Sequence, residues 1–328
     1  MKLKLHEFGE RRLVELVRRI CRPGKGVVVG IGDDAAAVEM DGQCIVATTD
    51  MLISKQHFPP GTSPEQMGRK AVAVNLSDLA AMGASPLGLL FSVGLPRDLD
   101  VELVERIVRG MDRAAREYGT SVVGGDIDES DEIVIAGAAF GSCRKERLMR
   151  RSGARPGDIL AVTGSLGAAS AGLSILLGKK PAGGYRALTK AQLDPVPRIR
   201  EGIALAGTGA VTSAIDITDS LASNLWQIAR ESGVRIVLEA DKLPVHPLVL
   251  KYAEDAGMDP MEFALFGGED LELLLTLRPD RIDRAFRALR RIGTALTPIG
   301  RVERGRGALV EKSGRIMRLP DRGYEHFR

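Results

Sequence analysis

The chain has 328 residues, which is enough for two ordinary domains. Apolar residues make up 44% and charged residues 27% of the chain, proportions typical of a soluble globular protein. The net charge is only +3 and aromatic residues are 4%, so we expect neither nucleic acid nor an anionic membrane surface as a partner.

Cysteine usage and the first residues add two exclusions. Cys21, Cys44 and Cys143 are far apart and form no CxxC pair, which gives no sign of a zinc site or a disulfide framework. The N-terminus lacks the apolar segment of a signal peptide, and no apolar run reaches membrane-spanning length. We therefore expect a cytoplasmic enzyme.

The first elements of the chain end in carboxylates. Apolar residues at helical spacing predict a helix over 5–20, and Val27–Val29 predicts a buried strand that ends in Gly30-Ile31-Gly32-Asp33-Asp34. For this segment alone, a strand closed by a turn that contains Asp is the simpler interpretation. Strands are predicted over 35–38 and 44–48 around an Asp41-Gly42 turn, with the second ending at Thr48-Thr49-Asp50.

A long helix should follow a loop that contains His57. Ser63 is a suitable N-cap, Pro64 suits the first helical position and Gln66 completes a capping box, so the helix should run from Ser63 to about Gly83. Asp78 lies in this helix among small and apolar residues. A buried carboxylate needs a partner, and a bound cation would be one.

The rest of the first half alternates strands with one helix. We predict strands over 89–94, 121–123 and 133–141, and an amphipathic helix between Asp100 and Tyr118. The strand over 121–123 is predicted to be buried and to end in Gly124-Gly125-Asp126. A charged connector over 144–151 places the domain boundary, giving domains 1–145 and 146–328.

The second half begins with a strand over 159–162, the glycine loop Thr163–Gly167 and a helix over 168–177. This order can present backbone N–H groups to a phosphate, but a plain connecting turn is an equal alternative. Asp216 and Asp219 come at the start of the next helix, where capping by one Asp or by Thr218 explains only part of the pattern. The remaining predicted elements are strands over 234–238, 271–277 and 298–302 and helices over 247–256 and 280–292.

The recurring carboxylates indicate phosphate chemistry. Several aspartates without His or Cys favour a hard cation such as Mg²⁺, which shares carboxylates with substrate phosphates. Such a site suits phosphoryl transfer, in which the protein positions groups and screens charge. Arg151 and Lys70 could hold phosphate oxygens, although a solvated surface charge is the simpler interpretation of each one alone.

These motifs together resemble the thiamine-monophosphate kinase family, part of the superfamily that includes aminoimidazole ribonucleotide synthetase. The resemblance covers nearly the whole chain, and its most specific block is Asn75-Leu76-Ser77-Asp78-Leu79-Ala80-Ala81-Met82-Gly83-Ala84. The other matching segments are Gly30–Asp34, Thr48–Asp50 with His57-Phe58, Gly124–Asp126, Arg151–Gly153 with Pro156–Asp158, Asp216–Asp219, Gly267–Asp270 and the terminal Gly323-Tyr324-Glu325-His326-Phe327.

The resemblance implies a fold, an activity and a site. The fold would combine α+β and α/β parts: an N-terminal sheet-plus-helices domain that pairs in a homodimer, and a C-terminal α/β domain that completes the active site. The activity would be ATP- and Mg²⁺-dependent phosphorylation of thiamine monophosphate to thiamine diphosphate by direct transfer, without a covalent nucleophile. Carried over by motif, the metal ligands would be Asp34, Thr48, Thr49, Asp50, Asp78, Asp126, Asp216 and Asp219; the ATP contacts Gly125, Asp126, Arg151 and Thr218; and the substrate contacts His57, Glu269 and Tyr324.

The sequence departs from the family pattern at Ser220, Asn224, Leu271 and Ile127, where Gly, Asp, Tyr and Thr are usual. Two alternatives are open: another ATP-using superfamily member with a different acceptor, or a nucleotide-binding regulatory protein without catalysis, for which the changes at Ser220 and Asn224 are the only support. A selenophosphate synthetase would need a reactive Cys and a nearby Lys, which Cys21 and Lys25 offer without the expected glycine setting.

Overall fold

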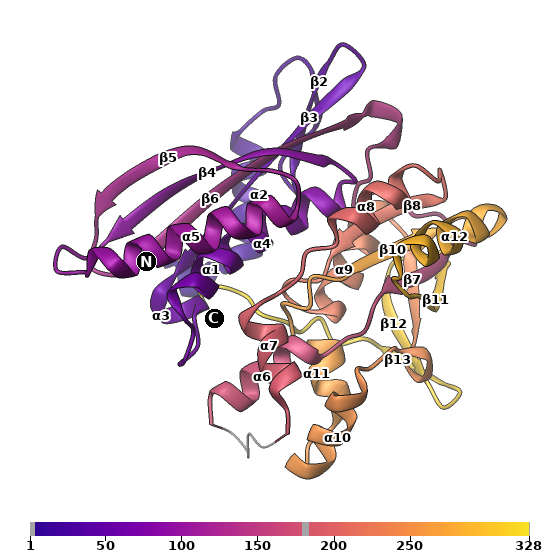
Figure 1. Ribbon diagram of the computed structural model, residues 1–328. Coiled ribbons are helices and arrows are strands. Elements are labelled where there is room, and N and C mark those ends of the chain that lie inside the picture. Colours follow the sequence, from indigo (N-terminus) through magenta and orange to yellow (C-terminus); the bar gives the residue numbers. More distant parts are fainter. Residues whose placement is uncertain (1–3, 179–183, 328) are drawn as a thin grey trace.

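The computed structural model describes residues 4–178 and 184–327 and contains two β-sheets with helices packed against them (Figure 1). Met1–Leu3, part of the segment without a signal-peptide pattern, lie outside the described residues. The first sheet has the order β1-β2-β3-β6-β4-β5 and the second the order β13-β12-β9-β11-β7-β10-β8. The strands are β1 Val27–Val29, β2 Ala36–Met40, β3 Gln43–Ile53, β4 Ser85–Leu95, β5 Val122–Glu129, β6 Val134–Arg144, β7 Ile159–Thr163, β8 Val211–Asp216, β9 Arg235–Glu239, β10 Leu273–Leu277, β11 Leu296–Glu303, β12 Gly307–Lys312 and β13 Arg315–Arg318.

The first sheet is antiparallel except for its last pair, β4 and β5, which the helix α5 connects. The predicted Asp41-Gly42 hairpin is present, and both residues have the positive φ angles, 51° and 76°, that a tight two-residue turn requires. The sequence misplaced one strand end, because β3 continues through Thr48–Asp50 to Ile53. It also predicted β5 as buried, whereas β5 is an exposed edge strand that runs on to Glu129.

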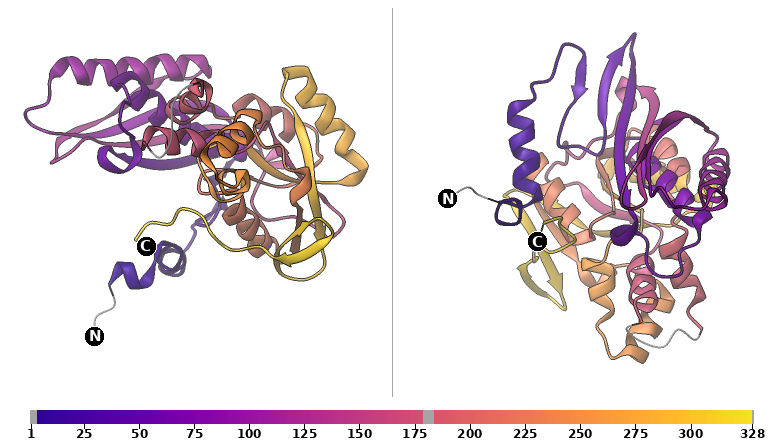
Figure 2. Two further views of the ribbon diagram at one scale, coloured as in Figure 1. Left: turned by 90° about the horizontal axis from the view of Figure 1, so that it is seen from below. Right: turned by 90° about the vertical axis from the view of Figure 1, so that its left-hand side faces the viewer.

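The helices lie around both sheets. Figure 2 shows α5 as a layer over the first sheet in its left view. The α-helices are α1 Leu5–Phe8, α2 Glu10–Ile20, α3 Ser54–His57, α4 Pro64–Ala81, α5 Val101–Glu117, α6 Ala168–Leu176, α7 Arg186–Leu193, α8 Ile199–Ala206, α9 Leu221–Ser232, α10 Pro247–Ala256, α11 Pro260–Phe266 and α12 Ile282–Ile292. None of the helices in the described part of the chain is long and apolar enough to cross a membrane.

Helix α4 is the central packing element. Its predicted start is confirmed: Ser63 accepts a hydrogen bond from the backbone N–H of Gln66, and Gln66 accepts one from the Ser63 N–H in return. Glycines let two other helices approach closely. A Cβ at Gly68 would lie 2.0 Å from a backbone oxygen of α5, and a Cβ at Gly202 of α8 would lie 2.1 Å from the Ala80 oxygen. Helix α4 therefore packs against both halves of the chain.

The second sheet is mixed, with β12 and β9 as its parallel pair. Strand β10, next to the edge strand β8, is buried along its whole length between β7 and β8. The sequence missed the short helices α7 and α11 and the strands β8, β12 and β13. Most of these elements have fewer than eight residues, which leaves too few periodic positions to distinguish them from loops.

The first described helices, α1 and α2, lie near the last described residues of the chain in both figures. The helix predicted over 5–20 is broken at Gly9, whose φ is 79°, and no residue of α1 or α2 is fully buried. Arg11 pairs with Asp321 at 2.7 Å, and Glu10 accepts a hydrogen bond from the His326 N–H at 2.9 Å. The N-terminal segment thus contacts the end of the chain.

Candidate active site

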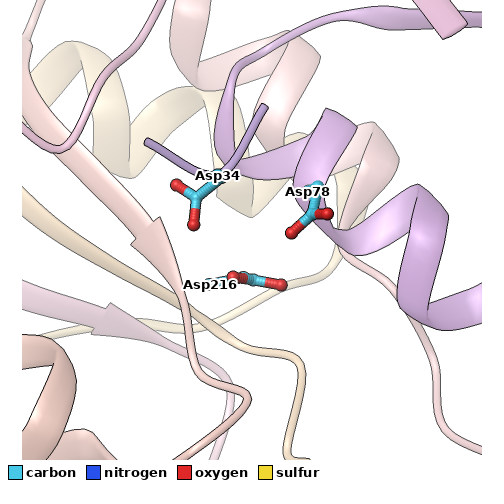
Figure 3. A group of neighbouring side chains, drawn as sticks. All are labelled: Asp34, Asp78 and Asp216. Atoms are coloured by element: carbon cyan, nitrogen blue, oxygen red, sulfur yellow. The ribbon is translucent and has the colours of Figure 1, made fainter. Parts of the chain in front are cut away.

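Three aspartates from distant segments meet in one place (Figure 3). Asp34 follows β1, Asp78 lies in the last part of α4 and Asp216 ends β8. Each contributes a carboxylate oxygen to a group whose members all lie within 4.8 Å of one another. The group joins the first half of the chain to the second, and all three residues are among the metal ligands predicted from the sequence.

Burial makes these carboxylates costly to ionise. It raises the pKa of Asp34 to about 7, despite the opposing attraction of Arg151, and Asp216 adds to the rise. Burial also raises the pKa of Asp78 well above its usual value, with Asp216 as the largest charge contribution. One buried oxygen of Asp34, Oδ2, has no hydrogen-bond partner among the residues that the structure describes. A proton or a cation would satisfy this arrangement.

Neighbouring hydroxyl and guanidinium groups fix the orientation of the three aspartates. Ser77 Oγ donates to Asp216 at 2.5 Å, and Thr48 Oγ1 donates to Asp78 at 2.5 Å. The Arg151 guanidinium donates twice to Asp34 Oδ1, at 2.6 Å and 3.1 Å. Arg151 is thus close enough to the cluster to serve both the acids and a phosphate group.

Two further predicted ligands, Asp50 and Asp219, extend the acidic group. Burial, followed by repulsion from Asp219 and Asp34, raises the pKa of Asp50. Burial also raises the pKa of Asp219 to about 6, with Glu10 as the next cause. The backbone N–H of Asp50 donates to Asn75 Oδ1 at 3.2 Å. Both acids therefore lie within electrostatic range of the cluster.

Neither Asp216 nor Asp219 caps the helix α9 that follows them. Ser220 is the N-cap, and its Oγ accepts from the Ser223 N–H at 3.0 Å. The idea that one Asp or Thr218 caps this helix is therefore wrong. Ser220, one of the departures from the family pattern, takes that role because its side chain reaches the free N–H groups of the first turn.

Three of the predicted site residues, Thr49, Gly125 and Asp126, lie apart from the acidic cluster in this single chain. The open face of the first sheet, defined as the side away from α4, carries Val38, Met40, Met51 and Leu90. Alternation along β3 places Thr49 on this face, where its hydroxyl donates to the Gly137 carbonyl. Asp126 is exposed and pairs with Ser92 on the same face, next to Gly125.

The glycine loop Thr163–Gly167 does not leave its N–H groups free. Asp270 accepts from the N–H groups of Gly167 at 2.7 Å and Ala169 at 3.1 Å. A carboxylate of the protein thus occupies the start of α6. Of the two interpretations of this loop, the structure favours the connecting turn.

The predicted substrate contacts His57 and Glu269 are brought together by Lys70. Lys70 Nζ lies 2.5 Å from Glu269 Oε1 and donates to the His57 carbonyl at 3.1 Å. Its side chain is only 2% exposed, so the interpretation of Lys70 as a surface charge is wrong. Nothing in the sequence indicated this pair, because residues 70 and 269 belong to different halves of the chain.

The third predicted substrate contact, Tyr324, lies next to the same region. Its hydroxyl accepts a hydrogen bond from Gln56 Nε2, one residue before His57. Its ring packs edge-on against His326, with centroids 4.9 Å apart, and His326 lies 6.0 Å from the His57 ring. Tyr324 is half exposed, so a face of the ring remains open to solvent.

The donor set of the acidic cluster fits magnesium. Asp34, Asp78 and Asp216 offer only oxygen atoms, which a hard divalent cation prefers, and neighbouring Thr48 adds another oxygen. The unpartnered Oδ2 of Asp34 supplies a buried acceptor. Ser77 and Gln192 were not among the predicted site residues. Ser77 donates a hydrogen bond to Asp216 of the acidic cluster, and Gln192 donates one to the predicted substrate contact Glu269.

The two halves define a protein class. Residues 32–143 match the model of the AIR synthase related protein N-terminal domain, and residues 155–312 match that of the C-terminal domain. The chain is thus an AIR synthase related protein with both domains present. A structure of HypE from E. coli, a hydrogenase maturation protein, has the same fold at a TM-score of 0.70 and 21% identity, covering 95% of this chain and 97% of that one.

Within this class the similarity is much higher to one group. Thiamine-monophosphate kinase from Pyrococcus horikoshii is 40% identical over 298 residues, covering 91% of both chains, and that from Aquifex aeolicus is 36% identical over 99% of this chain and 100% of its own. The structure of AaThiL complexed with AMPPCP and TMP superposes with a TM-score of 0.88, 36% identity and 99% coverage of each chain. The chain belongs to the thiamine-monophosphate kinase family and is a kinase.

Proposed function

We propose that this kinase transfers the γ-phosphoryl group of ATP to thiamine monophosphate and forms thiamine diphosphate, with Mg²⁺ held by its acidic cluster. The observation that carries the proposal is the convergence of two predicted sets of residues on α4: the acids near Asp78 and the acceptor contacts near Lys70. The relatives named above are thiamine-monophosphate kinases, and the structural relative binds AMPPCP and TMP.

The acidic cluster would hold the metal. Asp34, Asp78 and Asp216 would ligate Mg²⁺, with Asp50 and Asp219 close enough to take part in binding further ions. Bound Mg²⁺ would neutralise charge on the transferred phosphoryl group and on the leaving ADP. Arg151, now paired with Asp34, would turn its fork of N–H donors towards a phosphate once a cation relieves that carboxylate.

The acceptor would bind beside His57, Glu269 and Tyr324. The exposed face of Tyr324 suits stacking on a flat heterocycle, and Glu269 offers a carboxylate to ring substituents. In the reaction, an oxygen of the acceptor phosphate forms a bond to the γ-phosphorus as the bond to the β–γ bridging oxygen breaks. This transfer needs no covalent intermediate on the protein.

We also propose that the chain acts as a homodimer that pairs through the open face, and that 1–145 and 146–328 are its domains. The open face supports this pairing, because four large apolar side chains on it, Val38, Met40, Met51 and Leu90, are 41–58% exposed. Thr49 and Asp126 lie on that face, so pairing would bring both near the partner.

The test is the formation of thiamine diphosphate from thiamine monophosphate, ATP and Mg²⁺, followed by chromatography of the products. We expect product only with the monophosphate and the metal, and none with free thiamine or with EDTA. Tight binding of Mg·ATP without product would instead support a different acceptor or a regulatory protein, the second of which Ser220 and Asn224 favour.

A further inference from the structure

Lys70 is among the most deeply buried charged residues of the described chain. Lysine is seldom fully buried unless its ammonium group is paired. Here Nζ lies 2.5 Å from Glu269 Oε1 and donates to the His57 carbonyl at 3.1 Å. One ammonium group therefore touches two of the three residues that line the proposed acceptor pocket.

Glu269 is held from several directions. Its Oε2 accepts from Gln192 Nε2 of α7, and its backbone N–H donates to the Thr218 carbonyl at 2.8 Å. Its φ of 68° lies in the left-handed region, which a residue with a side chain adopts only when its surroundings enforce it. A Cβ on the preceding Gly268 would lie 2.1 Å from the Thr218 oxygen, so this loop has little room to shift.

Lys70 and the acidic cluster share one rigid element. Asp78 lies eight residues after Lys70 in α4, which separates them by roughly 12 Å along the helix axis at 1.5 Å per residue. The helix is capped at its start and packed against α5 and α8. A contact at Lys70 therefore places Glu269, from the second half of the chain, at a fixed distance from the metal cluster.

We infer that Lys70 is a positioning residue that sets the place and direction of the Glu269 carboxylate, and through it the fit of the acceptor relative to the phosphoryl donor. The inference rests on the proposed function, because it takes Glu269 and His57 as acceptor contacts. Lys70 acts through these two groups. With Glu269 and the His57 carbonyl it has committed two of its three donors inside the protein.

The position of Lys70 also predicts which kinetic constant changes when it is replaced. Loss of the ammonium group leaves Gln192 as the remaining side-chain partner of the Glu269 carboxylate, which is then less firmly oriented, so the acceptor binds less well, while the Asp34, Asp78 and Asp216 cluster is untouched. The Glu269 side chain is 33% exposed and can be hydrated. Its loss of a partner therefore does not leave a fully buried charge, and the fold should persist.

The test is a steady-state comparison of the unaltered protein with Lys70→Met, which keeps most of the apolar stem and removes the charge. We expect the KM for thiamine monophosphate to rise at least tenfold, while the KM for ATP stays within twofold. The matched control is Lys145→Met, which breaks an ion pair of 2.6 Å with Glu39 outside the pocket. That variant should leave both constants within twofold.

A double-mutant cycle separates positioning from a general structural role. If Lys70 acts through Glu269, then adding Lys70→Met to Glu269→Gln should raise the acceptor KM by less than twofold beyond the single Glu269 variant. Multiplicative effects of the two substitutions would overturn the inference, as would an equal rise of both KM values in Lys70→Met. Glu269→Gln leaves the buried Lys70 ammonium without its carboxylate, so circular dichroism must show that both single variants and the double variant are folded before the KM values are compared.

The experiments distinguish a wrong proposed function from a wrong role for Lys70. If the unaltered protein makes no thiamine diphosphate, the proposed function is wrong and the role of Lys70 in the acceptor site falls with it. If the unaltered protein is active and Lys70→Met, shown by circular dichroism to be folded, keeps its acceptor KM, only the role of Lys70 is wrong.

Discussion

The buried carboxylates of Asp34 and Asp33 are not fully compensated by the groups that surround them in the protein. Asp34 has a fully buried side chain, one oxygen paired with Arg151 and the other without a hydrogen-bond partner. Asp33, its neighbour, accepts from the Arg151 N–H, and burial raises the pKa of Asp33 to about 6. At neutral pH these carboxylates oppose folding unless a cation joins them.

The raised pKa of Asp34 predicts how magnesium and pH together affect the thermal stability of the protein. The pKa of Asp34 is about 7 in the folded chain and near 3.8 when unfolded, so its protonated form favours folding. That stability is present below about pH 4 and is lost as the pH rises through 7. We therefore expect Mg²⁺ to raise Tm more at pH 8 than at pH 5.5, where protons compete with the metal.

Differential scanning calorimetry with 10-fold steps of MgCl₂ measures this effect, and NaCl at equal ionic strength is the control. Equal shifts of Tm at the two pH values would contradict the metal assignment of the cluster. A rise of Tm with NaCl alone would point to general charge screening instead.

The sequence predicted individual residues best where chemistry is local. Asp34 follows a predicted strand, Asp78 is a lone carboxylate on an apolar stretch of helix, and Asp216 precedes a predicted helix, so each was found by its own surroundings. The sequence offered Lys70 only as a possible phosphate contact and did not indicate Gln192, because each of them pairs with a residue far away in the sequence, Glu269. A pair between residues 70 and 269 leaves no pattern in either segment.

At the scale of elements, local signals worked for helix α4 and failed for strand ends. The capping box at Ser63 fixes the start of α4 through bonds between near neighbours, and the sequence displays it completely. Polar residues do not end β3, because its backbone bonds to β6 continue through Asp50 to Ile53. Pairing with a distant strand decides that boundary, and the sequence does not show the partner.

The N-cap of α9 gives a prediction at this scale. Ser220 accepts from the Ser223 N–H and donates to the Arg322 carbonyl at 2.9 Å, and it is fully buried. Ser220→Ala should lower the free energy of unfolding by about 1–2 kcal/mol, because it leaves a helix N–H and a tail carbonyl without this partner.

Urea unfolding at constant metal concentration measures the loss. Ser121→Ala, an exposed serine before β5, is the matched control and should change the free energy of unfolding by less than about 0.5 kcal/mol. An unchanged midpoint for Ser220→Ala would show that water replaces the lost bonds and that the cap contributes little.

At the scale of the whole molecule, the sheet orders lay beyond the sequence. In the first sheet β6 inserts between β3 and β4, and in the second β10 lies between β7 and β8. Both arrangements join strands that are far apart in the chain. Length and the charged connector predicted two domains and the resemblance to the family supplied their architecture, and the family-model matches bear out an N-terminal and a C-terminal domain.

The proposed homodimer is tested by charging the open face. Leu90 is 41% exposed on β4, and an arginine there would oppose burial against a second copy. Leu90→Arg should therefore halve the mass measured by size-exclusion chromatography with light scattering. Val108→Arg, on the exposed side of α5, is 52% exposed and should leave the mass unchanged. A monomeric unaltered chain would remove the open face from consideration as an interface.

The contact between the two chain ends also bears on synthesis. Arg11 and Asp321 are 310 residues apart in sequence, and Tyr324 meets Gln56 only when the last residues are in place. These contacts therefore form only after residues 321–324 have been synthesised. The acceptor pocket is thus completed later than the acidic cluster, and a product truncated before Tyr324 would carry the cluster without the aromatic ring.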